Sequence, residues 1–191
     1  MLPRSIQKFI TAFSALPSIG PRQATRLAFY LVSLGSASII EIAEAARGLA
    51  ALSTCPDCFF FSEGSVCPFC GNPARRKDVL AVVERPTDVI AIEATRKFNG
   101  VYLVVGELKK TGALDPVQKL KLERGKARGP FKEILLALDQ TTYGDFNAQT
   151  IAKELAGVTE KITRLGRGIP TGGEIEFADE DTLGSAIEKR S

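Results

Sequence analysis

The 191-residue sequence contains no histidine, no tryptophan and a single methionine. Because histidine is the commonest general base, its absence excludes the Ser-His and Cys-His nucleophile pairs of many hydrolases. No apolar run approaches the ~20 residues that a membrane-spanning helix needs, and no targeting segment is visible at the N-terminus. We therefore expect a globular protein of the cytoplasm, not bound to a membrane.

Cysteine is scarce and confined to one stretch, since all four cysteines lie between positions 55 and 70. Two residues separate the members of each pair, which lets both sulfurs of a pair approach one ion from a tight turn, or knuckle. Two knuckles close a tetrahedron of thiolates, the arrangement that Zn²⁺ prefers in structural sites. The four predicted zinc ligands are Cys55, Cys58, Cys67 and Cys70.

Two disulfides or four free thiols are the alternatives, but disulfides need an oxidising compartment. With all four coordination positions taken by protein, the metal is expected to hold structure and not to catalyse. The loop between the pairs is too short for a core of its own, so Phe59, Phe60 and Phe61 should pack on neighbouring parts of the chain. Gly71, after the second pair, can take the left-handed conformation that such a turn often needs.

The net charge of +3 conceals an uneven distribution. Residues 1–35 carry basic side chains and no acid, and residues 109–132 contain a second basic run. This asymmetry suggests a polyanionic partner, although a solvated helix face explains a single charge run equally well.

The N-terminal part reads as helical. Apolar residues recur at helical spacing from Ile6 to Phe13, a second helix begins at Pro21, and a third spans residues 38–52. The glycine turn at residues 16–22 makes the first two a helix-hairpin-helix, which can present backbone N–H groups to a phosphate. Arg22 and Arg26, one turn apart, are the candidate DNA contacts; a purely structural helical hairpin is the alternative.

After Gly71, buried strands alternate with helices. Strands are predicted at residues 79–83, 101–105, 134–138 and 162–165, with helices at 86–95 and 146–156. This order indicates a mainly parallel sheet, whose ligands gather at the carboxyl ends of strands, where Glu84 and Asp139 lie. A flexible turn over residues 166–173, a strand at 174–177 and a helix capped by Asp179 complete the chain.

Four segments in this order resemble the RecR family of bacterial recombination mediators. They are Leu16-Pro-Ser-Ile-Gly-Pro-Arg22, the four-cysteine spacing, Val82-Val-Glu-Arg-Pro-Thr-Asp-Val89 and Thr163-Arg-Leu-Gly-Arg-Gly-Ile-Pro-Thr-Gly-Gly173. The resemblance implies a multi-part α/β (α+β) chain. Its parts are a helix-hairpin-helix region at 1–53, a C4 zinc finger at 54–72, a Toprim domain at 78–173 and a C-terminal strand and helix at 174–191.

In Toprim domains a glutamate ends the first strand and an Asp-x-Asp-x-x-Gly element follows the third, and these carboxylates hold Mg²⁺. Glu84 and Asp139 match that pattern, but Thr141 stands where the second aspartate belongs, with Asp145 as a nearby acid. Glu84, Asp139 and Asp145 are therefore a possible weak Mg²⁺ site, incomplete for two-metal phosphoryl chemistry.

The resemblance implies a DNA-binding mediator, not an enzyme, that acts on single- and double-stranded DNA. It would help to load RecA onto SSB-coated single strands together with RecO and RecF, as a homodimer or a ring-like homotetramer. The alternative is a Mg²⁺-dependent Toprim nuclease or DNA-nicking enzyme, which Thr141 disfavours. A zinc-stabilised scaffold without DNA affinity is a third hypothesis.

Overall fold

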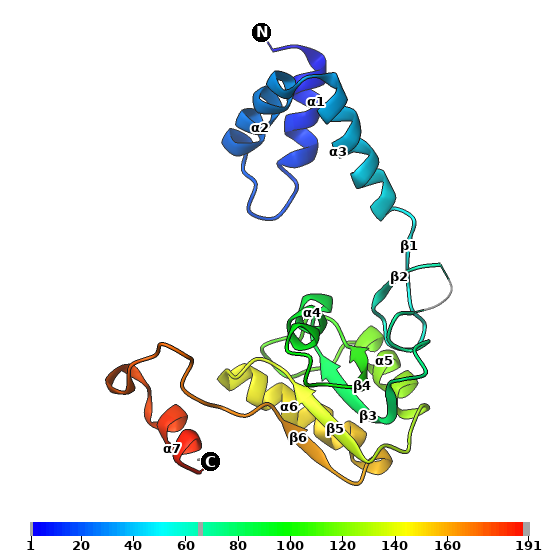
Figure 1. Cartoon of the computed structure of the whole chain (residues 1–191), viewed down its shortest axis with the longest axis vertical. Helices are drawn as coiled ribbons and strands as arrows, with labels where there is room; N and C mark the ends of the chain where they lie inside the picture. The colour runs from blue at the N-terminus through cyan, green and yellow to red at the C-terminus, as the bar shows by residue number, and fades with distance from the viewer. Residues whose placement is uncertain (1, 65–66, 189–191) are drawn as a thin grey trace. The chain divides into compact units, whose positions relative to one another are not determined.

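The computed structural model describes residues 2–64 and 67–188, which group into two compact units divided between Leu52 and Ser53 (Figure 1). Each unit is rich in its predicted kind of secondary structure: helices in the first, and strands alternating with helices in the second. None of the helices in these ranges is long and apolar enough to cross a membrane.

The first unit consists of three helices, as predicted: α1 (Arg4–Phe13), α2 (Pro21–Leu34) and α3 (Ser36–Leu49). Pro21 occupies the first turn of α2, where its missing N–H costs nothing. Helix α3 begins two residues earlier than predicted, directly after Gly35, whose φ of 87° breaks the helical path after α2. It ends at Leu49, and the following residues enter the short strand β1 (Leu52–Thr54).

The helical unit has a small core. Among its described residues only Ala24 and Ala28 are buried, whereas Leu27, on the next position of α2 after Arg26, is 37% exposed. Three short helices cannot enclose all the apolar side chains that they carry, so much of this surface stays open.

The second unit is built on a four-stranded parallel sheet in the order β4-β3-β5-β6. Its strands are β3 (Arg76–Val83), β4 (Gly100–Val104), β5 (Glu133–Ala137) and β6 (Ile162–Arg164), at the predicted places. Helices α4 (Pro86–Ala94) and α6 (Thr142–Leu155) confirm the predicted alternation. Strand β3 pairs with both β4 and β5, so the central strand is the one that leads to Glu84.

Successive residues of the strands feed two separate clusters, one on each face of the sheet. Leu80, Val82 and Leu103 pack with residues of α6 and of α5 (Pro116–Lys126). Ala81, Val83 and Tyr102 pack instead with α4 and with the cysteine knuckles. Both faces of the sheet are thus covered, which explains why the strands read as continuous apolar runs.

Helix α5 was not predicted, because the charges of the basic run obscure its pattern. Asp115 and Gln118 form a capping box at its start: Gln118 N donates to Asp115 Oδ1 at 2.8 Å, and Asp115 N donates to Gln118 Oε1 at 2.9 Å. Leu122 and Gly125 face the core. The Asp-Pro-x-Gln order is itself a helix-start signal that sequence reasoning could have used.

The predicted strand at residues 174–177 is wrong. The segment forms a single 3₁₀ turn, η2 (Ile175–Phe177), in which Phe177 N donates to Glu174 O at 3.2 Å. Ile175 and Phe177 are 68% and 79% exposed, and among residues 2–64 and 67–188 no strand pairs with this segment. The last helix, α7 (Glu180–Glu188), follows as predicted, and Asp179 caps it by accepting from Thr182 N at 2.9 Å.

Short elements frame the rest. Strands β1 and β2 (Phe61–Glu63) form a two-stranded sheet that holds the ends of the first knuckle, and η1 (Ala156–Val158) follows α6. Helix α6 starts four residues earlier than predicted because Thr141 caps it.

Candidate metal centre and nucleic-acid interface

The four cysteine sulfurs converge on one point. All four lie within 4.8 Å of one another, and Cys58 Sγ is 3.4 Å from Cys67 Sγ. A tetrahedral zinc site with Zn–S bonds of about 2.3 Å places its sulfurs about 3.8 Å apart, so the cluster fits such an ion. Cys55, Cys58 and Cys67 are buried, and Cys70 is half-buried. A closed set of four thiolates suits a structural metal and leaves no position for a reacting water.

Each knuckle is a short hydrogen-bonded turn. Phe59 N donates to Cys55 O at 3.0 Å, and Gly71 N donates to Cys67 O at 2.9 Å. The residue with left-handed torsion is Phe59, with a φ of 62°. Gly71 is not among the described residues with positive φ, so the second knuckle does not use the left-handed conformation that glycine allows.

Basic side chains tie the knuckles to the sheet. Arg128 donates from Nη1 to Tyr102 O at 3.0 Å and to Asp57 O at 3.3 Å, and its Nη2 lies 3.9 Å from Cys70 Sγ. Lys77 Nζ donates to Cys70 O at 2.6 Å and to Asn72 O at 2.9 Å. A metal bound by four thiolates carries net negative charge, and these two cations lie where they can offset it.

The cysteines differ in acidity. A hydrogen bond with Cys58 and the charge of Arg128 lower the pKa of Cys70 to about 6, although burial opposes them. The same hydrogen bond, together with burial, raises the pKa of Cys58.

The aromatic residues around the knuckles pack against the sheet. Phe69 meets Phe60 edge-on at 4.9 Å between ring centroids and Tyr102 at 5.1 Å. Phe59 and Phe60 pack on the two core clusters, which confirms the packing predicted for them. Phe61 contacts Phe60 but remains 48% exposed.

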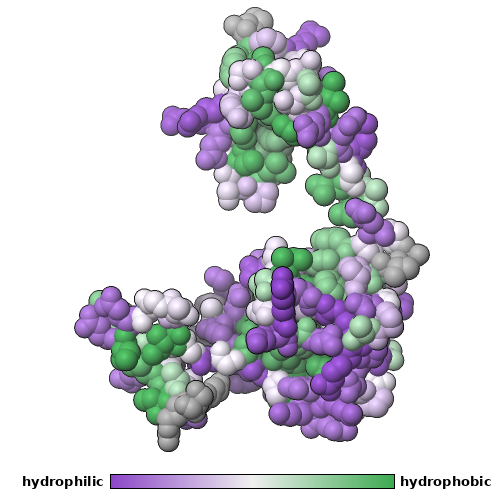
Figure 2. Space-filling view, viewed as in Figure 1, coloured by the Kyte–Doolittle hydropathy of each residue, from purple (hydrophilic) through white to green (hydrophobic). Residues whose placement is uncertain are grey.

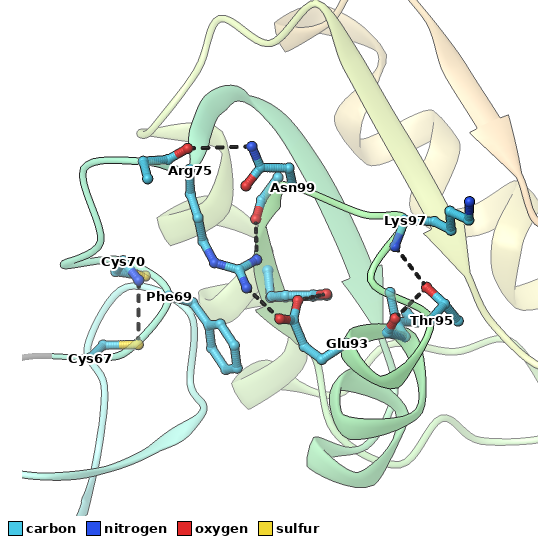
Figure 3. Close-up of polar contacts among 12 residues, drawn as sticks. Cys67, Phe69, Cys70, Arg75, Glu93, Thr95, Lys97 and Asn99 are labelled. Carbon is cyan, nitrogen blue, oxygen red and sulfur yellow. Dashed lines mark hydrogen bonds and ion pairs between the residues drawn. The ribbon is translucent and has the colours of Figure 1, made fainter.

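A polar network lies beside Phe69 (Figure 3). Glu93 of α4 accepts hydrogen bonds from Arg75 and from the Tyr102 hydroxyl, and the Arg75 guanidinium lies 4.8 Å from the centre of the Phe69 ring. Arg75 also donates to Gly100 O at 2.8 Å. The network links the second knuckle to α4 and β4.

The three acids proposed for Mg²⁺ each have a partner within the chain. Glu84 Oε1 accepts from Leu108 N at 2.8 Å, and Asp139 Oδ2 lies 3.4 Å from Arg85 Nη2. Asp145 is held by Arg164 at 2.6 Å and Arg167 at 2.7 Å, and these two side chains keep the pKa of its carboxyl below 3.8. Within residues 2–64 and 67–188, the four cysteines are the one converging set of metal-ligand side chains. Magnesium binding by the three acids stays a prediction.

The start of α2 is open to an anion. Arg22 and Arg26 are exposed, the first turn carries no acid, and Gly20 provides no side-chain cap. The N–H groups of Arg22 and Gln23 therefore lack helical acceptors. A Cβ added to Gly20 would meet nothing within 4 Å, and its φ of −83° suits any residue. Neither the packing around Gly20 nor its backbone torsion therefore requires a glycine. A residue without a side chain would, however, let a phosphate outside the chain come close to the backbone.

Comparison with known proteins covers nearly the whole chain. Residues 6–47 match the family described as RecR, helix-hairpin-helix, residues 78–166 match the Toprim domain, and residues 168–191 match RecR, C-terminal. Recombination protein RecR of Clostridium perfringens is 37% identical over 195 residues, which span 99% of this chain and 97% of the relative. That of Roseiflexus sp. is 35% identical over 200 residues, spanning 100% and 95%. The chain belongs to the RecR family.

In this RecR-family chain, Thr141 is the residue at which the sequence departs from the Toprim pattern, and the structure shows what it does instead. Its hydroxyl accepts from Gly144 N at 3.0 Å and so caps α6. Aspartate caps a helix in the same way, so threonine retains the cap and removes a carboxylate. Gly144 meets a steric demand, since a Cβ there would lie 1.9 Å from Asp139 O.

Sequence reasoning on this RecR-family chain missed the residues that support the ligands. Arg128 was noted only as part of a basic run, and Arg164 and Arg167 only as letters of the tail motif. Their contacts with Cys70 and Asp145 join segments far apart in the chain, which spacing alone does not reveal.

Proposed function

We propose that this chain is a DNA-binding recombination mediator whose helix-hairpin-helix holds phosphates at the start of α2. The observation that carries the proposal is the acid-free, uncapped first turn of α2, with Arg22 and Arg26 exposed beside it. Backbone N–H groups and arginines together bind phosphate without reading base sequence. The name of its relatives, Recombination protein RecR, is in keeping with that role.

In the cell, the protein would assist the loading of RecA onto SSB-coated single strands together with RecO and RecF. We place it in the cytoplasm, where thiols stay reduced. The metal of the four-cysteine cluster is proposed to be zinc, because a closed tetrahedral thiolate set suits that ion.

The same proposal excludes DNA cleavage by the Toprim part. Two arginines already neutralise Asp145, and Thr141 removes the second acid of the metal-binding element. Phosphoryl chemistry with two metal ions requires free carboxylates in place of these partners.

We further propose that the helical unit pairs with a second copy of the chain, in a homodimer or homotetramer. Apolar side chains show at its surface between polar ones (Figure 2). Val32 of α2 and Ile40 and Ile42 of α3 are 59%, 57% and 45% exposed, and exposed apolar side chains of this kind around so small a core are typical of an interface.

The expected mass of the purified protein in light scattering is therefore two or four times that of one chain. Ile40→Glu should lower it because a charge buried between copies is costly. Lys8→Glu, which places a glutamate at an exposed position of α1 and makes an even larger charge change, is the control. A wild-type mass equal to one chain would remove this proposal.

The DNA site is tested by salt dependence. Arg22→Ala combined with Arg26→Ala should weaken binding to unrelated DNA sequences alike, because the contacts are to phosphate. Each lost phosphate contact should reduce the slope of log affinity against log salt by about 0.9 on duplex and about 0.7 on single strands. Fluorescence anisotropy over a range of salt concentrations measures both.

The competing site is the basic run on α5. Lys119→Ala combined with Arg124→Ala is the matched control, since both side chains are exposed. Lys121 is a poorer choice, because its ammonium lies 5.1 Å from the centre of the Phe59 ring and contributes to packing. A slope unchanged in the arginine variant but reduced in the α5 variant would move the DNA site to the second unit.

The proposal that the Toprim part does not cleave DNA has its own test. Incubation of the protein with DNA and Mg²⁺ should leave the DNA uncut in every sample.

A further inference from the structure

A groove runs along one side of α2, next to the exposed arginines. It is lined by Gln23, Arg26, Leu27 and Tyr30, which share a helix face and are here called its floor, and by Ser18 and Ile19 of the preceding turn. The groove has a volume of about 550 Å³. This volume falls in the range of about 300–1,000 Å³ that ligand pockets occupy.

The lining of the groove suits a flat, partly polar ligand. Tyr30 is 60% exposed, and within the described residues neither its hydroxyl nor the Gln23 side-chain amide has a hydrogen-bond partner. Leu27 adds apolar surface, and no acid lines the groove. An exposed aromatic ring with free hydrogen-bonding groups beside it is the usual platform for an unstacked base.

The positive charge of two arginines next to the groove favours a flat ligand that also carries a phosphate. Arg26 is itself part of the floor, and Arg22 lies one turn before it on α2. A strand whose phosphates contact these arginines brings its bases to the adjoining face of the helix. A base in a duplex is stacked and paired, so it cannot enter the groove without leaving the helix.

We propose that this groove receives an unpaired base of single-stranded DNA, with Tyr30 stacking on the base and Arg26 contacting its phosphate. The proposal rests on the proposed DNA binding through Arg22 and Arg26. It adds a contact that single strands make and duplexes do not, and so predicts that Tyr30 gives the protein a preference for single strands.

The groove is separate from the apolar face proposed to meet a second copy. Val32 follows Tyr30 by two residues, which is about 200° around a helix. Val32 instead borders a second pocket with Ile6, Phe9 and Ile39. Contact between copies on that side leaves the Tyr30 side open to DNA.

The test compares three probes of equal length: an oligothymidylate, a strand made of abasic sites, and a duplex. Tyr30→Ala should weaken oligothymidylate binding by about fivefold or more, the effect of losing one stacked base. Binding to the abasic strand and the duplex should not change, and neither should any salt slope. Tyr30→Phe should keep most of the affinity, because it keeps the ring. Phe29→Ala is the control, since Phe29 is 50% exposed but does not line the groove.

Because the chain has no tryptophan, Tyr30→Trp places a single indole in the groove as a reporter. Its fluorescence should be quenched by oligothymidylate and not by the abasic strand. An equal loss on all three probes in Tyr30→Ala, or no loss on oligothymidylate, would overturn the proposal, as would a fall in assembly mass in that variant. Failure of the phosphate site gives a different result, an unchanged salt slope in the double arginine variant, so the two failures can be told apart.

Discussion

Cys58→Ser is expected to abolish zinc binding and to unfold the knuckles, reducing the zinc content from one ion per chain to none. Cys58 is fully buried, and its sulfur is central to the cluster. Binding of structural zinc contributes about 10–16 kcal/mol to small metal-dependent folds, far more than the ~1 kcal/mol cost of an average substitution. The loss should expose Phe69 and lead to aggregation.

The sheet explains why aggregation should follow. Strand β4 lies at an edge of the sheet, and the first knuckle covers part of that edge, with Val104 N donating to Cys58 O at 2.8 Å. When the knuckle unfolds, this N–H becomes free to pair with another chain.

Elemental analysis measures the zinc content, thermal unfolding measures the loss of stability, and light scattering measures the aggregation. Asp57→Ala is the matched control, because it changes an exposed side chain in the same knuckle and leaves every sulfur in place. Freshly purified wild-type protein without zinc would disprove the assignment of the metal. So would a Cys58→Ser protein that keeps its zinc and its melting temperature.

Glu93→Ala should destabilise the second unit by about 2–3 kcal/mol, through loss of the hydrogen bonds that pair a largely buried arginine. The Arg75 side chain is 10% exposed, and Glu93 is its carboxylate partner. The change leaves a guanidinium and the Tyr102 hydroxyl without that acceptor. Denaturant unfolding monitored by tyrosine fluorescence or circular dichroism measures the effect.

Asp78→Ala is the control for this experiment. Asp78 pairs with Arg76 at 3.2 Å, but the Arg76 side chain is 57% exposed, so water replaces the lost partner. An equal loss of stability in the two variants would contradict the burial argument.

The same network gives stability a pH dependence. Burial raises the pKa of the Glu93 carboxyl, but hydrogen bonds from Arg75 and Tyr102 outweigh burial and hold it below 4.5. The folded state thus favours the ionised carboxylate, whose contribution is present above the unfolded pKa and is lost as pH falls through the folded one. Wild-type stability should decrease below about pH 4.5, and Glu93→Ala should show a smaller decrease.

The sequence predicts best where one local pattern determines the structure. The Cys-x-x-Cys spacing predicted a cluster that the structure brings together, and the apolar runs predicted the four strands of the sheet. Pro21 predicted the start of α2, and Asp179 predicted the cap of α7. For α2 and α7 the deciding interaction lies within a few residues of the signal, and for the cluster and the strands the local pattern itself marks the residues that are buried or that meet.

Prediction from sequence was less successful where distant contacts decide. The segment at residues 174–177 has strand-like alternation, but in the part of the chain that the structure describes no strand pairs with it. Asp145 appeared to be a free acid, whereas two arginines about twenty residues later neutralise it. Helix α5 was missed for another reason: its lysines and arginines obscured a capping signal that was present.

In the turn after β5, the residue types that the fold needs can be distinguished from those that metal-dependent chemistry would need. The fold needs a residue without a side chain at position 144 and a capping side chain at 141. Serine, threonine, asparagine and aspartate all meet the second need with similar stability. Position 141 can therefore exchange a neutral cap for a charged one by a nearly neutral substitution, so this carboxylate of the metal-binding element can be lost or regained in evolution without rebuilding the scaffold.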